Sequence, residues 1–96
     1  MLNKILFPEH KYASAYIWQD SDGYTLVSYS TCVAHLDNDG WLTVNGLYSA
    51  TTRKHLGWFA KYVARLANST VTYYDMKRCY ADRQRYNVLT GEVQDR

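Results

Sequence analysis

Two cysteines and three histidines are the residues with the clearest chemical potential in this sequence. Cys32 and His35 have the Cys-x-x-His spacing of half a zinc site. Side chains three positions apart in a β-strand point to opposite faces, so this pair would not share a metal ion. Nothing near Cys32 or Cys79 indicates a lowered thiol pKa, and both are expected to be half-buried free thiols. The sequence therefore predicts no metal site and no cofactor.

No other part of the chain indicates a catalytic site. There is no Gly-rich phosphate-binding loop, no Walker motif and no Gly-x-Ser-x-Gly motif. Two pairs of aspartates lie in turn sequences, where Asp is favoured by its backbone hydrogen bonding alone. They are Asp20 and Asp22, and Asp37 and Asp39. We therefore expect a protein that is not an enzyme.

Size and composition predict one small domain over residues 1–96, with 1–10 and 87–96 loosely attached. The chain is 47% hydrophobic and 21% charged, which excludes a fully disordered or collagen-like protein. No apolar run approaches the roughly 20 residues of a membrane helix, and the first residues do not form a convincing secretory signal. The expectation is a soluble cytoplasmic protein without a membrane partner.

The charge is distributed unevenly along the chain. Residues 1–48 contain two cations and five carboxylates, a net charge of −3, whereas residues 49–96 contain nine and four, a net charge of +5. The overall charge is therefore only +2, but the C-terminal half is basic. This asymmetry favours an acidic partner that is bound through the C-terminal half.

The first half of the chain predicts a three-stranded antiparallel meander. Segments 11–20, 24–37 and 41–49 are rich in aromatic and β-branched residues, and Asp-Gly turn signals separate them at Asp22-Gly23 and Asp39-Gly40. Neither face of 24–37 is cleanly polar. That long strand is therefore expected to be central and covered, or to carry a bulge that switches its faces.

The pattern then changes to the period of a helix over residues 49–68. The residues expected at the helix ends are Ser49, Thr51 or Thr52 as the N-cap and Asn68 as the stop. One apolar stripe predicts which side packs on the sheet. Its main members are Leu56, Phe59, Val63 and Leu66.

Residues 71–80 alternate like a fourth strand, with Tyr74 and Met76 on its expected core side. The last segment, around Thr90-Gly91, is interpreted either as a short hairpin or as a mobile tail. The complete prediction is an α+β fold: an antiparallel sheet of three meander strands, one amphipathic helix across it, and at least one further strand.

The other side of the helix is the candidate partner-binding surface. It lies at about 140–240° on the helical wheel, away from the apolar stripe. Its residues are Lys54, Trp58, Lys61, Tyr62 and Arg65. Trp, Tyr and Arg are concentrated in protein interfaces, which favours a contact face. The alternative is that Trp58 and Tyr62 fold over onto a loop or the N-terminal segment.

Two further surfaces remain open as binding sites. Thr51, Thr52 and His55 at the helix start are candidates for contact with an anionic group. Tyrosines such as Tyr29 and Tyr73 could stack bases beside the basic helix, provided that they lie on an open sheet face.

Two segments of the chain resemble a group of small, uncharacterised phage and mobile-element proteins. The first is Tyr29-Ser-Thr-Cys-Val-Ala34, and the second is Tyr48-Ser-Ala-Thr-Thr-Arg-Lys-His55, at the opening of the helix. The resemblance implies a phage or prophage accessory protein that binds a host macromolecule in the host cytoplasm. The specific hypothesis is an inhibitor of bacterial defence, such as an anti-CRISPR protein, with an acidic host protein or ribonucleoprotein as its partner. The alternative is a small nucleic-acid-binding protein; monomer and homodimer both remain open.

Overall fold

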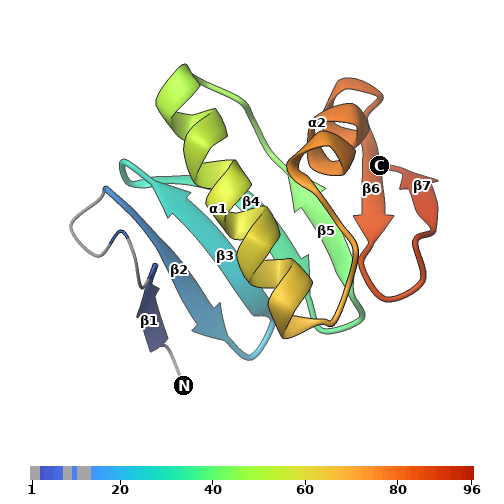
Figure 1. The fold of residues 1–96 in the computed structure, drawn as a ribbon, viewed down its shortest axis with the longest axis horizontal. Coiled ribbons are helices and arrows are strands. Elements are labelled where there is room, and N and C mark those ends of the chain that lie inside the picture. Colours follow the sequence, from blue (N-terminus) through green and yellow to red (C-terminus); the bar gives the residue numbers. More distant parts are fainter. Residues whose placement is uncertain (1–2, 8–9, 11–13) are drawn as a thin grey trace.

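The computed structural model describes residues 3–7, 10 and 14–96. In this part of the chain a seven-stranded antiparallel sheet carries two helices on one face (Figure 1). The strands lie side by side in sequence order. The elements are β1 (Asn3–Leu6), β2 (Ala15–Asp20), β3 (Gly23–Ser28), β4 (Thr31–Asp37), β5 (Trp41–Val44), α1 (Ala50–Leu66), α2 (Tyr73–Ala81), β6 (Gln84–Asn87) and β7 (Val93–Asp95). The predicted α+β fold with an antiparallel sheet is confirmed, with more strands and one more helix than expected.

Both Asp-Gly turns of the predicted meander are present. The Asp20 carboxylate accepts a hydrogen bond from the Asp22 N–H (2.8 Å) in the turn that joins β2 to β3. The Asp37 carboxylate accepts from the N–H groups of Asp39 and Trp41 (both 2.9 Å) in the turn that joins β4 to β5. These carboxylates therefore serve the backbone, as the turn chemistry predicts.

The expected long strand 24–37 is wrong, because the chain reverses at Tyr29 and Ser30 and forms the hairpin of β3 and β4. Both turn residues have left-handed φ values, 50° and 67°. A two-residue turn of this kind normally uses Asn-Gly, since most side chains disfavour positive φ. Tyr-Ser carries no such signal, so the aromatic and β-branched pattern continues unbroken through the turn.

A bulge, one of the two alternatives for this segment, is present on β4. Between Leu26 and Val27 of β3 the register skips one residue of β4, so Val33 and Ala34 in succession are both buried. Cys32 and His35 consequently lie on the same face, contrary to the expectation for an uninterrupted strand. The expectation of half-burial is also wrong for both cysteines, because Cys32 is exposed and the Cys79 thiol is buried.

Helix α1 begins and ends where the sequence indicates. The Ser49 side chain accepts a hydrogen bond from the Thr52 N–H (3.1 Å) and caps the helix start. Asn68 has a φ of 50°, and the next residue, Ser69, donates its N–H to the Ala64 carbonyl (2.8 Å), which closes the last turn.

The apolar stripe of α1 faces the sheet as predicted for three of its four main residues. Leu56, Phe59 and Val63 are fully buried. Leu66 is 46% exposed, so its predicted burial is wrong. It is the final helical residue and lies at the margin of the stripe, where the sheet no longer covers it.

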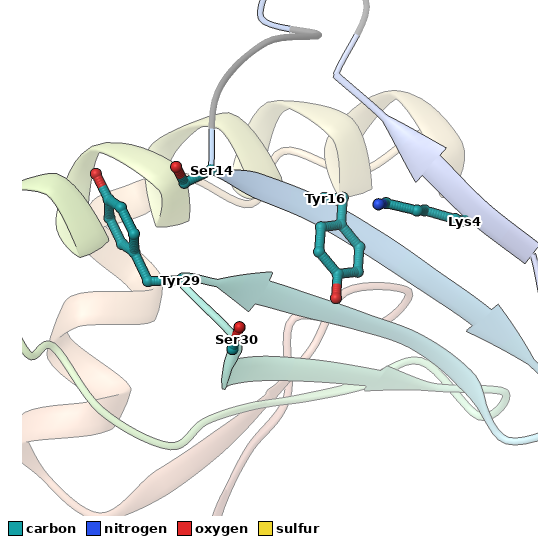
Figure 2. Close-up of a pocket in the computed structure, with 5 residues that line it drawn as sticks. All are labelled: Lys4, Ser14, Tyr16, Tyr29 and Ser30. Carbon is teal, nitrogen blue, oxygen red and sulfur yellow. The ribbon is translucent and has the colours of Figure 1, made fainter.

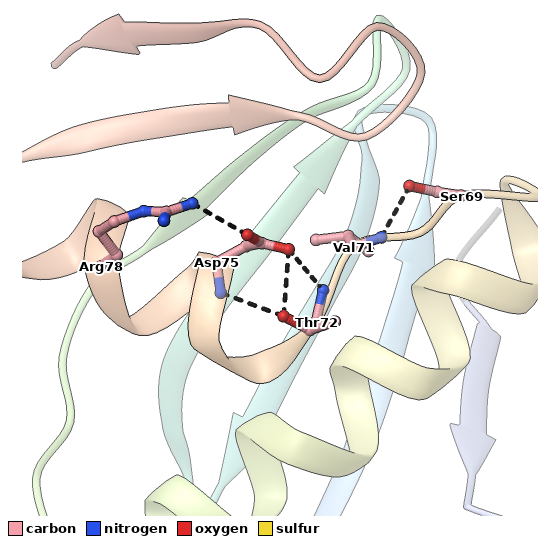
Figure 3. A network of polar contacts seen from close by, with 5 residues as sticks. All are labelled: Ser69, Val71, Thr72, Asp75 and Arg78. Carbon is pink, nitrogen blue, oxygen red and sulfur yellow. Dashed lines mark hydrogen bonds and ion pairs between the residues drawn. The ribbon is translucent and has the colours of Figure 1, made fainter.

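Residues 71–80 do not form a strand; α2 occupies most of this segment. Thr72 and Asp75 make a reciprocal capping box: the Asp75 N–H donates to Thr72 Oγ1 (3.3 Å), and the Thr72 N–H donates to Asp75 Oδ2 (2.9 Å) (Figure 3). Arg78 adds an ion pair to the same carboxylate (3.0 Å). Met76 and Cys79, three positions apart, form the buried side of α2. The cap and this helical spacing outweigh the β-propensity of Val71 and the two tyrosines.

The hairpin interpretation of the C-terminal segment is confirmed, since β6 and β7 pair antiparallel. The Asn87 side chain supports the connecting loop by accepting hydrogen bonds from the N–H groups of Leu89 (2.9 Å) and Thr90 (3.1 Å).

No helix in the described part of the chain is long and apolar enough to cross a membrane.

The core lies between the two helices and one face of the sheet. Alternate residues of the strands point into it, among them Ile17, Leu26 and Leu42, which pack under α1 and α2. Both helices lie on the same side of the sheet in Figure 1, α1 across β3 and β4 and α2 beside β5 and β6. No described helix covers the other side, which we call the uncovered sheet face.

Candidate functional site

The uncovered sheet face has a continuous row of side chains across five strands. Strand pairing places Lys4, Trp18, Thr25, His35 and Thr43 opposite one another in this order. Paired residues of an antiparallel sheet share a face, so these side chains stand on the same side. The Thr25 hydroxyl and His35 Nδ1 share a hydrogen bond of 2.8 Å in the middle of the row. The centre of the face is therefore polar.

Aromatic rings and a cation gather at the β1–β2 side of this face. The rings of Tyr16 and Trp18 meet edge to face, with their centroids 5.6 Å apart. The Lys4 ammonium lies 4.4 Å from the Tyr16 ring centroid. Both rings are half-buried, and the neighbouring Leu6 is 46% exposed. This side of the face offers flat apolar surfaces with a positive charge next to them.

A second aromatic ring with a cation stands on β5 and β6. The Arg85 guanidinium lies 4.4 Å from the Trp41 ring centroid, and the Trp41 ring is half-buried. Arg85 also donates a hydrogen bond to the Gln94 side chain (2.7 Å), which holds the guanidinium in place. Strand pairing places Trp18 in the same row as Thr43, and Trp41 lies two residues from Thr43 along β5, so Trp18 and Trp41 stand three strands apart on the same face.

The four aspartates of the first half of the chain lie together at one end of the sheet. Asp20, Asp22, Asp37 and Asp39 all belong to the two Asp-Gly turns, which lie at the same ends of their strands. The hairpin turn at Tyr29 lies at the opposite end. The negative charge of these aspartates is therefore concentrated at one end of strands β2 to β5.

The structure divides the predicted partner-binding residues of α1 into covered and exposed ones. The Trp58 ring stacks on the ring of His10 (centroids 3.8 Å apart) and meets the ring of Phe7 edge to face (5.5 Å). Part of the N-terminal segment thus packs on Trp58, as the alternative interpretation expects. The Tyr62 ring packs against Tyr24 (6.1 Å), and burial raises the pKa of Tyr62.

The cations of α1 are the accessible part of that surface. Lys54, Lys61 and Arg65 are exposed, and the Lys54 ammonium lies 5.5 Å from the Trp58 ring centroid. A shallow apolar groove runs beside them between α1 and the start of α2. Its lining includes Gly57, Trp58, Lys61, Ala64, Val71 and Tyr73.

Only one of the three residues expected to contact an anion at the helix start is exposed. Thr51 is accessible, whereas Thr52 and His55 are buried. The His55 Nδ1 shares a hydrogen bond of 2.7 Å with the Ser28 hydroxyl. Burial, followed by the charges of Lys54 and His10, lowers the pKa of His55 below its ordinary value of 6.5. The imidazole is therefore neutral at pH 7 and holds the helix on the sheet; its expected exposure is wrong.

The residues that make the uncovered sheet face were not selected by the sequence reasoning. The available signal was the alternation in β2, where Tyr16 and Trp18 alternate with the buried Ala15 and Ile17. Of the tyrosines considered for base stacking, Tyr29 is 59% exposed at the hairpin turn. Tyr73 lies on α2, away from this face. Among the described residues, no three His, Cys, Asp or Glu side chains come together as metal ligands do.

Residues 5–80 match a family of unknown function (DUF8033), and the chain belongs to this family. The match extends from β1 to the last turn of α2 and so includes most of the uncovered sheet face. No curated protein and no solved structure matches the chain.

Proposed function

We propose that this DUF8033 member is a non-enzymatic protein that binds single-stranded nucleic acid on the uncovered sheet face. The observation that carries the proposal is the presence of Trp18 and Trp41 on a face that no described helix covers. The Arg85 guanidinium lies against the Trp41 ring, and the Lys4 ammonium lies against Tyr16, whose ring meets Trp18 edge to face. Proteins that bind single strands combine stacking platforms for bases with positive charge for the backbone. Single strands suit the face because their bases are free to unstack and lie on aromatic rings.

Charge complementarity supports a polyanion as the occupant. The cations of the face, Lys4 and Arg85, stand beside the rings on which bases would stack. The nearest turn carboxylates, Asp20 and Asp37, are held by backbone N–H groups at one end of the sheet. The polar centre formed by Thr25 and His35 offers hydrogen-bonding groups to base edges.

Fluorescence anisotropy with single-stranded DNA and RNA of about 12 nucleotides tests the proposal, since single-strand sites span about 4–16 nucleotides. Stacking contributes about 1–3 kcal/mol per base, so Trp18→Ala and Trp41→Ala should each weaken binding by about fivefold or more. Tyr74→Ala is the matched control, because this ring is 77% exposed but lies on α2. Its affinity should equal that of the unmodified chain.

The salt dependence adds a second measurement of the same surface. Replacing Arg85 by Gln should reduce the slope of log affinity against log salt concentration by about 0.7, the value for one phosphate contact on a single strand. Duplex DNA of the same length should bind more weakly, since its bases are already stacked. Absence of binding at about 50 mM salt, where phosphate contacts are strong, would rule the proposal out.

A second candidate function rests on α1. Arg53, Lys54, Lys61 and Arg65 lie on this helix, which contains no carboxylate. The one ion pair among the described residues, Arg78 with Asp75, belongs to α2. These cations, with the groove beside them, fit an acidic host protein, and the resemblance to phage and mobile-element proteins supports inhibition of a bacterial defence system, such as CRISPR, as the outcome.

Phage plating on a defence-competent host that expresses the chain tests this second candidate. The number of plaques should rise when the host expresses the unmodified chain or Trp18→Ala. It should not rise with a double variant of Lys61→Glu and Arg65→Glu, which reverses charge on exposed residues only. Equal plating with and without the chain would reject the candidate.

A further inference from the structure

A hollow lies at the end of the uncovered sheet face that is opposite to the aspartate turns. It has a volume of about 430 Å³ and is lined by Lys4, Ser14, Tyr16, Tyr29 and Ser30 (Figure 2). Among the residues that the structure describes, the lining contributes four hydroxyl groups and one ammonium group, and no carboxylate. In Figure 2 the rings of Tyr16 and Tyr29 stand apart, with Ser30 between them and Lys4 beside Tyr16.

The hollow is built on a turn that its own residues disfavour. Tyr29 and Ser30 have φ values of 50° and 67°, a region that side chains other than those of Gly, Asn and Asp rarely adopt. The Tyr29 N–H donates to the Ser14 carbonyl (2.9 Å), and the Tyr29 ring lies against His55 (centroids 5.8 Å apart). The fold therefore holds a large, 59% exposed aromatic residue where an Asn would be less strained. Strain of this kind concentrates at functional sites.

The hydrogen-bond donors that line the hollow favour a ligand with negatively charged oxygen atoms. Hydroxyl groups donate to phosphate oxygens, and the Lys4 ammonium supplies a charge-assisted hydrogen bond. The Lys4 ammonium lies 4.4 Å from the Tyr16 ring centroid, and Lys4 is one of the residues that line the hollow. The described carboxylates of β2 to β5 lie at the other end of the strands and do not oppose an anion here.

We infer that this hollow binds a terminal phosphate of the nucleic-acid strand that lies on the uncovered sheet face. The inference rests on the proposed single-strand binding and adds a preference for one strand end. A terminal phosphate carries a charge of about −1.5 to −2 and three acceptor oxygens, whereas an internal phosphodiester carries one negative charge. The phosphate of a strand end therefore gains more from these donors than an internal one does.

The experiment compares one single-stranded oligonucleotide with a 5′-phosphate, with a 3′-phosphate and with neither. One of the two phosphorylated strands should bind the unmodified chain about fivefold or more tightly than the unphosphorylated strand. Tyr29→Phe and Ser30→Ala each remove one hydroxyl and keep the rest of the side chain. Each should reduce this preference and leave the affinity for the unphosphorylated strand unchanged.

A double variant separates ligand binding from a structural role. Replacing Tyr29 by Asn and Ser30 by Gly installs the favoured turn sequence, so the melting temperature should rise. The preference for the terminal phosphate should nevertheless be lost, because the aromatic wall and two hydroxyls are gone. A structural role alone predicts a stable variant with an unchanged preference.

The outcomes distinguish this inference from the proposed function. If all three strands bind equally and binding still depends on Trp18, the inference is overturned and the proposed function stands. If the double variant keeps the phosphate preference, the hollow is not the site. If no strand binds, both are overturned. A preference that is reduced in Tyr29→Phe and Ser30→Ala, is lost in the double variant and persists in Tyr74→Ala supports the inference.

Discussion

The hydroxyl of Ser28 and Nδ1 of His55 share a buried hydrogen bond of 2.7 Å that ties the end of β3 to the first turns of α1. Both residues are nearly inaccessible, at 2% and 3% exposure. Tyr29, the residue after Ser28, packs its ring against His55. The bond thus connects the hairpin turn, the hollow beside it and the helix, although the two residues lie 27 positions apart.

Ser28→Ala should destabilise the protein by leaving His55 Nδ1 buried without a partner. The expected loss in the free energy of unfolding is about 1–3 kcal/mol, measured by urea denaturation. Thr25→Ala is the matched control, because Thr25 makes a bond of similar length (2.8 Å) to His35 on the uncovered sheet face, where water can replace it. Equal losses in the two variants would contradict the argument from burial.

Stability should fall when the pH is lowered from about 6.5 towards 5, because of His55. Its pKa is lowered in the folded protein, by burial first and then by Lys54 and His10, whereas the unfolded chain keeps a value near 6.5. Below pH 6.5 the unfolded state therefore binds more protons than the folded state, and stability decreases as the pH falls. Above pH 6.5 this contribution is complete.

Urea denaturation between pH 8 and pH 5 measures this contribution. His55→Gln keeps a polar side chain near Ser28 but does not titrate, so its stability should change less with pH over the same window. Most carboxylates titrate below this window. An identical pH slope in the variant and the unmodified chain would show that His55 is not responsible.

The parts of the fold that could be predicted from sequence are those in which local signals agree with packing. The apolar stripe around Phe59, the caps at Ser49 and Asn68, and the two Asp-Gly turns each specify the structure that is observed. In these places propensity, period and turn chemistry indicate the same conformation, so one sequence suffices.

The errors occur where tertiary contacts outweigh local preference. Residues 71–80 have strand propensity, but the burial of Met76 and Cys79 against β5 and β6, together with the capping box of Thr72 and Asp75, selects a helix. Tyr29 and Ser30 occupy a turn that their side chains disfavour, because the pairing of β3 with β4 enforces it. The sequence indicated α1 as the candidate surface and not the sheet for a related reason. Which face of the sheet the helices leave open depends on how the layers assemble, and the sequence pattern does not specify this.

Phe59→Ala should remove most of the stability of this small domain. The side chain is fully buried at the centre of the α1 contact with the sheet, and its loss should cost about 3–5 kcal/mol in the free energy of unfolding. Leu66→Ala is the control on the same helix. Leu66 is 46% exposed, so its truncation should cost much less. Thermal and urea unfolding measure the loss of stability in each variant. Similar losses in Phe59→Ala and Leu66→Ala would contradict the orientation of α1 on the sheet.

Gly57→Ala should stabilise α1 and test which surface is used. Gly57 lies inside the helix, and a methyl group at its Cα would meet no atom within 4 Å. Removing the conformational freedom of glycine should therefore raise the free energy of unfolding by about 0.5–1 kcal/mol. Gly23→Ala is the opposite case, because the added methyl group would overlap the Leu36 carbonyl oxygen at a φ of +133°. It should destabilise the chain.

The same Gly57→Ala variant distinguishes the two candidate surfaces. The added methyl group projects into the groove beside Lys61, on the side of α1 away from the uncovered sheet face. Affinity for single-stranded nucleic acid should therefore be unchanged, although the protein is more stable. If the acidic-protein candidate holds instead, the methyl group in the groove should weaken the effect on phage plating while the fold remains intact. A loss of oligonucleotide binding in this stabilised variant would place the nucleic acid on α1 and contradict the assignment to the sheet.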